Sequence, residues 1–257
     1  MSFGSLLHRY LKYLDVHVTE RNQETFLDCL EPDAGALVLD CGCHAGYNAR
    51  KRGDAKGLKS IVGLERNLSV TREASERGIW IAQADLNCPM PLAAASLDVV
   101  MVSDVLEHLV ELSIFVGEAF RVLKPGGYAV ISTPNLASWH NIFALLIGIQ
   151  PFSGPHLSNF AQADLGPVRR LHEEMCQALA DEGWAEGEGD PAMYRHIVVG
   201  AYRSLCRLFV TEGFHLERVI GVGYHPLPPL LERVMTRLDR VHANHLVFKL
   251  RKPPVNS

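Results

Sequence analysis

The chain has 257 residues, a length that fits one large domain or two small ones. Its contents of 47% hydrophobic, 21% charged and 8% aromatic residues are those of an ordinary folded protein, which excludes disorder, collagen and coiled coil. The formal net charge of -4 creates no general field that would attract a polyanion, so we expect no nucleic-acid partner.

The sequence contains no pattern for membrane insertion or export. The longest strongly apolar run, Ile142–Ile149, falls well short of the ~20 residues needed to cross a bilayer. Arg9 and Lys12 interrupt the apolar run that a cleaved signal would require. The six cysteines lie among apolar neighbours, which is typical of reduced, buried thiols. We therefore expect a cytoplasmic protein with no membrane partner, and the sequence does not indicate its oligomeric state.

Residues 1–135 begin with helical periodicity and then change to short apolar segments. The periodicity predicts two helices within residues 1–34, one around Leu6–Leu14 and a short one around Phe26–Leu30, which would cover the rest of the domain. The apolar segments that follow alternate with helices or loops, as in a parallel sheet buried on both faces. The predicted strands are Ala36–Asp40, Ser60–Leu64, Trp80–Ala82, Leu97–Val102 and Tyr128–Ser132.

The pattern differs before and after the fifth predicted strand. A long helical pattern over Val105–Leu123 ends at Lys124-Pro125-Gly126-Gly127, where proline cannot continue a helix. Residues 136–194 contain helix-like stretches and an acidic, glycine-rich loop but no convincing strand, so we interpret them as a lid or substrate insertion. Strand patterns resume at His215–Val222 and His245–Leu250.

A glycine-containing turn after the first predicted strand is the strongest candidate for a ligand site. Asp40 ends this buried strand, and Gly42 and Gly46 follow where the chain must turn into a helix, so that backbone N–H groups can approach a ligand closely. Glu65 ends the next strand, at about the separation at which doubly wound folds place a carboxylate that accepts both ribose hydroxyls. The spacing Gly42-x-x-x-Gly46 does not match the signature of nicotinamide enzymes, which argues against a dehydrogenase.

These residues resemble the class I S-adenosylmethionine-dependent methyltransferases, in particular the type 11-like group, whose acid-x-Gly-x-Gly-x-Gly loop holds the methionine part of the cofactor. Three later segments strengthen the resemblance, namely Ala84-Asp85-Leu86, Leu97–Leu109 and Arg121–Asn135. The resemblance is strong over residues 37–135 and weaker over 196–252. It implies a single α/β domain over residues 1–257, with a Rossmann-like, mostly parallel seven-stranded sheet, an antiparallel last strand and helices on both faces.

The resemblance also implies the residues that bind S-adenosylmethionine. Glu65 would bind the ribose and Asp85 with Leu86 the adenine, and the remaining cofactor-binding residues would be Asp40, Gly42, Cys43, Gly46 and Ser103. The expected reaction is methyl transfer to a small-molecule acceptor, with oxygen as the expected atom. His44 departs from the family pattern because it replaces the middle glycine, and it favours the alternative of a catalytically silent binding module.

Asp104-x-x-Glu107-His108 is the best local candidate for catalysis, since on one helix these side chains would share a face. A helix capping box formed by Asp104 and Glu107 explains the same spacing without any catalytic role. The motif also resembles the divalent-metal motif of small-RNA 2′-O-methyltransferases and of some quinone-precursor O-methyltransferases, in which His196 would supply the later histidine. Asp104 replaces the glutamate of that motif, and the net charge does not favour RNA. The catalytic candidates are therefore His108, Glu107 and His196, with or without a metal ion.

The aromatic and histidine side chains of the predicted lid can be interpreted as substrate-binding residues or as ordinary structural residues. His140 and His156 would meet the substrate or lie on the surface as ordinary polar residues. Trp139, Phe143 and Phe152 would line an apolar pocket or pack the lid.

Overall fold

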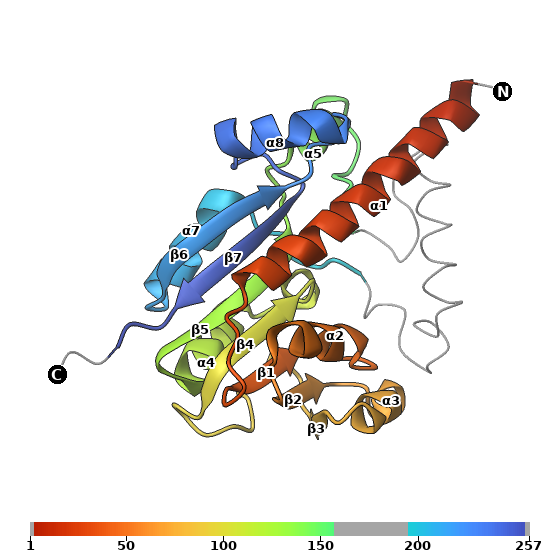
Figure 1. Ribbon diagram of the computed structural model, residues 1–257. Coiled ribbons are helices and arrows are strands. Elements are labelled where there is room, and N and C mark those ends of the chain that lie inside the picture. The colour runs from red at the N-terminus through yellow and green to blue at the C-terminus, as the bar shows by residue number, and fades with distance from the viewer. Residues whose placement is uncertain (1–2, 157–194, 255–257) are drawn as a thin grey trace.

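The computed structural model describes residues 3–156 and 195–254. In this part of the chain a seven-stranded sheet has the order β3-β2-β1-β4-β5-β7-β6 (Figure 1). Strands β1 to β5 are parallel, and β7 is antiparallel to both of its neighbours. The strands are β1 (Leu37–Cys41), β2 (Ser60–Glu65), β3 (Trp80–Gln83), β4 (Leu97–Ser103), β5 (Leu123–Pro134), β6 (His215–Val222) and β7 (His245–Arg251). The predicted Rossmann-like sheet with an antiparallel last strand is confirmed.

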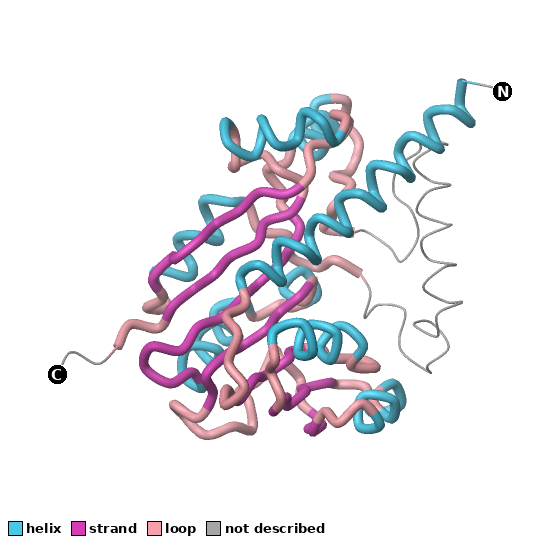
Figure 2. The backbone as a smooth tube through the Cα atoms, in the orientation of Figure 1, coloured by secondary structure: helices cyan, strands magenta, loops and turns pink. Residues whose placement is uncertain are grey.

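Helices cover both faces of the sheet, because its central strands carry apolar side chains in both directions (Figure 2). One apolar core joins the sheet to α1 (Phe3–Cys29), α2 (Tyr47–Lys56) and α3 (Arg72–Glu76). The core on the other face includes α4 (Leu112–Val122) and α7 (Tyr202–Thr211). Two further helices, α5 (Trp139–Leu146) and α8 (Pro229–Leu238), follow the carboxyl ends of β5 and β6.

The N-terminal residues form one continuous helix, where the periodicity predicts two. Helix α1 runs from Phe3 to Cys29 and packs Val18, Phe26 and Cys29 against the sheet. No proline or glycine lies between residues 5 and 31, so nothing in the backbone chemistry ends the helix at the polar stretch between the two apolar patterns.

The predicted helix over Val105–Leu123 is wrong in its first part. The structure has a short 3-10 helix, η2 (Leu106–His108), and α4 begins only at Leu112. The carbonyl oxygen of Glu107 accepts hydrogen bonds from the backbone N–H groups of Ile197 (2.6 Å) and Val198 (3.2 Å). A continuous helix would use that carbonyl for its own ladder, so a segment distant in sequence breaks the helix here.

The capping-box interpretation of Asp104 and Glu107 is also wrong. Asp104 has a φ of 53°, outside the helical region, and its carboxylate lies near the hydroxyls of Ser103 and Ser132 at 3.3 and 3.4 Å. The N-cap of η2 is Val105, without a side-chain cap. Asp104 therefore caps no helix.

Residues 136–156 of the predicted lid are described and contain α5, whereas residues 157–194 lie outside the described part of the chain. Among the described residues, no helix is long and apolar enough to cross a membrane.

Candidate functional site

The turn after β1 has the left-handed backbone that its glycines predict. Gly42 and Gly46 have φ values of 68° and 73°. A Cβ atom on Gly46 would lie 2.5 Å from Cδ1 of Ile79, so a side chain does not fit there. His44 adopts a φ of 46°, a conformation uncommon for residues other than glycine. The turn thus keeps its shape despite the substitution, with both ring nitrogens of His44 buried.

Two carboxylates lie at neighbouring strand ends beside this turn. Glu65 ends β2 and is only 9% exposed. Its Oε2 accepts a hydrogen bond from the N–H of His44 (3.1 Å) and its Oε1 one from the N–H of Asn67 (3.0 Å). The pKa of Asp40, on β1, is raised to about 6, mainly by burial; the charge of Arg52 lowers it and the charge of Glu65 adds to the rise. The pair forms an acceptor-rich end to the two strands.

Arg52 of α2 is a buried cation that the sequence analysis missed. Its side chain is 4% exposed, stacks over the ring of Phe26 at 3.9 Å and donates hydrogen bonds to Gln23 (2.6 Å) and to the hydroxyl of Ser103 (3.0 Å). Burial lowers the pKa of Arg52, and the charge of Asp40 opposes this effect. Arg52 therefore links α1, α2 and the end of β4 behind the glycine turn.

The other expected cofactor-binding residues also lie at the carboxyl ends of strands. Asp85 follows β3, and its Oδ1 accepts hydrogen bonds from the backbone N–H (2.9 Å) and the side-chain amide (3.0 Å) of Asn87. Leu86 is buried, at 7% exposure, and Ser103 ends β4. Cys43 packs over β2, because a Cβ on Gly63 would lie 2.4 Å from its Sγ. The structure thus brings the ends of β1, β2, β3 and β4 to one edge of the sheet.

Glu107, His108 and His196 form a second cluster at this edge. One oxygen of Glu107 and one nitrogen of each imidazole lie within 4.8 Å of one another, and Asp104 is not part of this group. The rings of His108 and His196 are 5.1 Å apart. Glu107 is fully buried, with its Oε2 accepting a hydrogen bond from Thr133 (3.2 Å). Burial raises the pKa of Glu107 well above its ordinary value and lowers that of His196 to about 3.

Backbone carbonyls orient both imidazoles of this cluster. Nδ1 of His108 lies 3.2 Å from the carbonyl oxygen of Arg195, and Nδ1 of His196 lies 2.7 Å from that of Ser153. A carbonyl oxygen only accepts, so each Nδ1 carries the proton. The Nε2 atom of each neutral ring is left with its lone pair for a metal ion or a proton, the arrangement usual for histidine ligands.

A chain of hydrogen bonds fixes the position of Ser153, whose carbonyl contacts His196. The Oδ1 of Asn244 accepts from the backbone N–H of His225 (3.2 Å), so Nδ1 of His140, 3.0 Å away, must donate to it. Nε2 of His140 then accepts from the hydroxyl of Ser153 at 3.2 Å. His140 thus lies in the frame that positions His196, a role not visible in the sequence.

His140 and His225 lie in a shared environment that favours the neutral ring. Burial lowers the pKa of His140 to about 3 and that of His225 to about 4. These values include a smaller lowering by the positive charges that neighbouring histidines would carry. The groups that face the two rings are the Leu14 carbonyl, His17, Glu232, Asn244 and His245.

We expect the free energy of unfolding to fall as the pH falls from 6.5 towards 4. Between these pH values both histidines are protonated in the unfolded chain and neutral in the folded chain. Each histidine therefore lowers the free energy of unfolding by about 1.4 kcal/mol for every pH unit of acidification. His140→Gln should remove one such slope in urea unfolding, whereas His215→Gln, at an exposed position, should leave it unchanged. An unchanged slope in His140→Gln would contradict the assignment.

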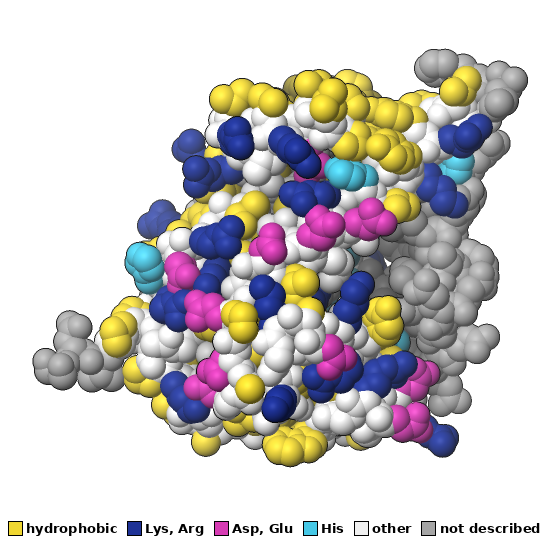
Figure 3. All heavy atoms as spheres, in the orientation of Figure 1, with side chains coloured by type: hydrophobic (Ala, Val, Ile, Leu, Met, Phe, Trp, Pro, Cys, Tyr) yellow, Lys and Arg dark blue, Asp and Glu magenta, His cyan; other side chains and the backbone are white. Residues whose placement is uncertain are grey.

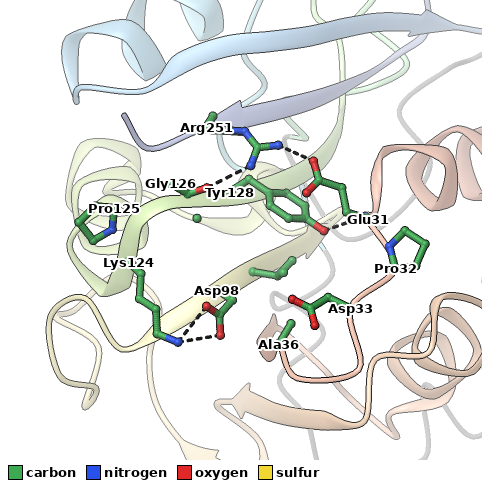
Figure 4. A pocket seen from close by; sticks show the side chains of 12 residues that line it. Glu31, Pro32, Asp33, Ala36, Asp98, Lys124, Pro125, Gly126, Tyr128 and Arg251 are labelled. Atoms are coloured by element: carbon green, nitrogen blue, oxygen red, sulfur yellow. Dashed lines mark hydrogen bonds and ion pairs between the residues drawn. The ribbon is translucent and has the colours of Figure 1, made fainter. Parts of the chain in front are cut away.

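A pocket of about 390 Å³ lies at the opposite edge of the sheet, near the amino ends of β1, β4 and β5 (Figure 4). Four of its five charged groups are paired with one another, and the fifth, Asp33, accepts a hydrogen bond from the backbone N–H of Gly35 (2.8 Å). Lys124 donates to both oxygens of Asp98 at 2.8 Å, and Arg251 binds Glu31 and the carbonyl oxygen of Gly126. These pairs tie strand ends together, and we assign the pocket no ligand.

Beside this pocket, Lys249 is a buried cation whose removal should destabilise the fold. It is 6% exposed, and its Nζ lies 2.5 Å from Glu31 and 2.9 Å from Glu217. We expect Lys249→Met to lower the free energy of unfolding by about 2 kcal/mol, because it leaves Arg251 to balance the charges of both Glu31 and Glu217. Lys124→Met removes a more exposed pair and should cost less than about 1 kcal/mol. Equal losses in urea unfolding would contradict this difference.

Comparison with known protein families gives one domain match. Residues 39–131 match the model of a family described as a methyltransferase domain. This range contains the glycine turn, the two carboxylates and Glu107 with His108, and it excludes His196.

Related proteins carry matching descriptions. The chain is 38% identical over 104 residues to a probable S-adenosylmethionine-dependent methyltransferase of Mycolicibacterium smegmatis, covering 40% of this chain and 39% of that protein. It is 30% identical over 202 residues to the ubiquinone biosynthesis O-methyltransferase of Psychrobacter arcticus, covering 76% of this chain and 65% of that protein. In each case the match spans less than two thirds of the relative.

Solved structures support the fold at lower identity. A methyltransferase of Thermotoga maritima, described as a possible histamine N-methyltransferase, superposes with a TM-score of 0.56 at 15% identity and covers 97% of both chains. A putative methyltransferase of Haloferax volcanii, solved with its Trm112 activator, gives 0.57 at 15% identity and covers 95% of this chain and 94% of that one. At such identities the likeness concerns the fold alone.

Proposed function

Because the chain belongs to the class I S-adenosylmethionine-dependent methyltransferases, we propose that it transfers the methyl group of this cofactor to an oxygen of a small-molecule acceptor. The observation that carries the proposal is the pair of carboxylates, Asp40 and buried Glu65, beside a left-handed turn. The ubiquinone biosynthesis O-methyltransferases among the relatives support oxygen as the acceptor atom.

The residues present fit the cofactor. The absence of side chains at Gly42 and Gly46 keeps the turn narrow, and the carboxylates offer acceptors for an amino group and for ribose hydroxyls. The residues that would bind it are Asp40, Gly42, Cys43, Gly46, Glu65, Asp85, Leu86 and Ser103. When bound, the cofactor supplies an electrophilic methyl group, and the chain's own task is to align the acceptor and exclude water.

We further propose that residues 136–194 enclose the acceptor. We also propose a cytoplasmic location, because the buried thiols of Cys41 and Cys43 fit a reducing compartment.

The acceptor hydroxyl needs a group that takes its proton. The neutral imidazoles of His108 and His196 provide lone pairs for this purpose beside buried Glu107.

The convergence of these three side chains favours a second candidate, a metal-assisted O-methyltransferase. Two imidazoles and one carboxylate suit a divalent ion, which would lower the pKa of a bound hydroxyl. In this form Glu107, His108 and His196 would hold the ion, and the hydroxyl of Thr133, which donates to Glu107, would orient the carboxylate.

Calorimetric titration with S-adenosylhomocysteine tests the proposed function. We expect saturable binding below millimolar concentration and methyl transfer to hydroxylated acceptors. Folded protein that binds no cofactor at millimolar concentration would overturn the proposal. Cofactor binding without transfer to any of a varied set of acceptors would favour the catalytically silent module.

A further inference from the structure

Two helices at the carboxyl edge of the sheet present large apolar side chains to solvent. Leu146 at the end of α5 is 79% exposed and Leu230 of α8 is 84% exposed. Figure 3 shows hydrophobic side chains gathered over α8 and α5, with basic side chains beneath them. The exposed residues are Trp139, Phe143, Leu145, Leu146, Ile147, Leu230, Leu231, Val234 and Leu238. Apolar patches of this kind mark interaction surfaces.

The two helices form one surface, which we call the α5–α8 face. The indole Nε1 of Trp139, at the start of α5, donates to Oδ2 of Asp239 at the end of α8 (2.9 Å). The ring of Trp139 also packs on His242 with a centroid distance of 4.4 Å, and its backbone N–H donates to the carbonyl oxygen of His242 (3.2 Å).

The charges of the α5–α8 face are of one sign. Arg233, Arg237 and Arg240 are exposed, and α5 contains no charged residue. The acids of α8 point elsewhere: Glu232 is 8% exposed and binds the N–H of Gly223 (3.0 Å), and Asp239, just after the helix, is occupied by Trp139 and His242. An apolar helix face with a basic rim and no available carboxylate complements an anionic lipid surface.

We propose that the α5–α8 face docks on an anionic membrane surface. The apolar side chains would enter the boundary between headgroups and acyl chains, and Arg233 and Arg237 of α8 would contact lipid phosphates. A second copy of the chain fits less well, since a two-fold symmetric pairing would bring like-charged arginines together. The proposal departs from the sequence-based expectation of no membrane partner, since docking on a membrane surface requires no helix that spans it.

Docking would also direct the candidate site towards the bilayer. Helix α5 follows the end of β5 and α8 the end of β6, so the α5–α8 face lies at the edge of the sheet that carries the glycine turn. An acceptor dissolved in the membrane would then be close to the site. This consequence rests on the proposed function, whereas membrane docking itself does not.

Flotation of the full chain with vesicles tests the proposal. We expect binding to vesicles of phosphatidylcholine with phosphatidylglycerol, weakening as salt rises, and little binding to phosphatidylcholine alone. Arg233→Gln with Arg237→Gln should weaken partitioning about thirtyfold, from about fivefold per basic residue. Leu230→Ser with Leu238→Ser should weaken it at least about tenfold. The control pair Arg207→Gln with Val210→Ser makes the same kinds of change on exposed positions of α7 and should bind as the unmodified protein does.

Three outcomes would overturn the proposal. The first is no binding to anionic vesicles, or binding that the α8 variants leave unchanged. The second is a dimer in sedimentation velocity that Leu230→Ser with Leu238→Ser dissociates. The third is protection of the Leu230 and Leu238 side chains from hydroxyl-radical oxidation in the vesicle-free monomer, which would assign the face to cover by another part of the chain. Unchanged S-adenosylhomocysteine affinity in the variants separates these outcomes from failure of the proposed function.

Discussion

Glu65→Ala is expected to weaken S-adenosylhomocysteine binding by at least about 100-fold, the loss of two charge-assisted hydrogen bonds of about 1.5–3 kcal/mol each. A carboxylate has about four lone-pair sites. In Glu65 two of them accept the backbone N–H groups of His44 and Asn67, so two remain for the ribose hydroxyls. Calorimetric titration measures the change.

Two further variants sharpen this prediction. Glu65→Gln should not restore binding, because its amide NH₂ would face one of the two backbone donors. Glu76→Ala on α3, an exposed position at 63% side-chain exposure, is the matched control and should bind normally. A folded Glu65→Ala protein whose affinity stays within about threefold of the original would remove the basis of the ribose assignment.

The sheet could be predicted because each buried strand is a short apolar run, whereas other features depend on contacts between distant residues. A polar stretch between two apolar patterns in α1 suggests two helices. Apolar periodicity shows which side chains are buried but not whether the helical backbone continues between them. The break after Asp104 depends on hydrogen bonds from Ile197 and Val198, about 90 residues later, which no local pattern encodes. The Asp104-x-x-Glu107-His108 motif, which the sequence predicts on one face of a helix, is therefore held by hydrogen bonds from the backbone of residues 197 and 198.

The candidate site could also be predicted only in part: its two carboxylates could be, whereas its buried arginine and the orientation of its histidines could not. Asp40 and Glu65 end apolar strands, so the side of the sheet on which they meet follows from topology. Arg52 lies in the basic run Arg50-Lys51-Arg52, and nothing in the sequence distinguishes the one that turns inward. The orientation of His196 depends on a hydrogen bond to the backbone carbonyl of Ser153. Every residue has such a carbonyl, so the amino-acid sequence does not indicate which one a histidine will bind.

His196→Ala is expected to weaken divalent-metal binding at least about 100-fold, because it removes one of three protein ligands from the cluster with Glu107 and His108. Calorimetry with Mn²⁺ or Zn²⁺ in the absence of cofactor reads this directly, without depending on turnover. His140→Gln should have a smaller effect, about tenfold, because it acts only through Ser153 on the orientation of His196. His242→Gln, whose imidazole pairs with Asp239, is the control and should bind the ion normally.

The response to chelators separates the two roles open to these imidazoles. With a bound ion, methyl transfer should stop on chelation and return with Mg²⁺, Mn²⁺ or Zn²⁺, and His108→Ala should show no such rescue. The Nε2 lone pairs of His108 and His196 serve equally well as proton acceptors, since both Nδ1 atoms donate to carbonyls. Transfer that resists chelation yet disappears in His196→Ala would therefore contradict the metal site and assign the imidazoles to proton transfer from the acceptor hydroxyl.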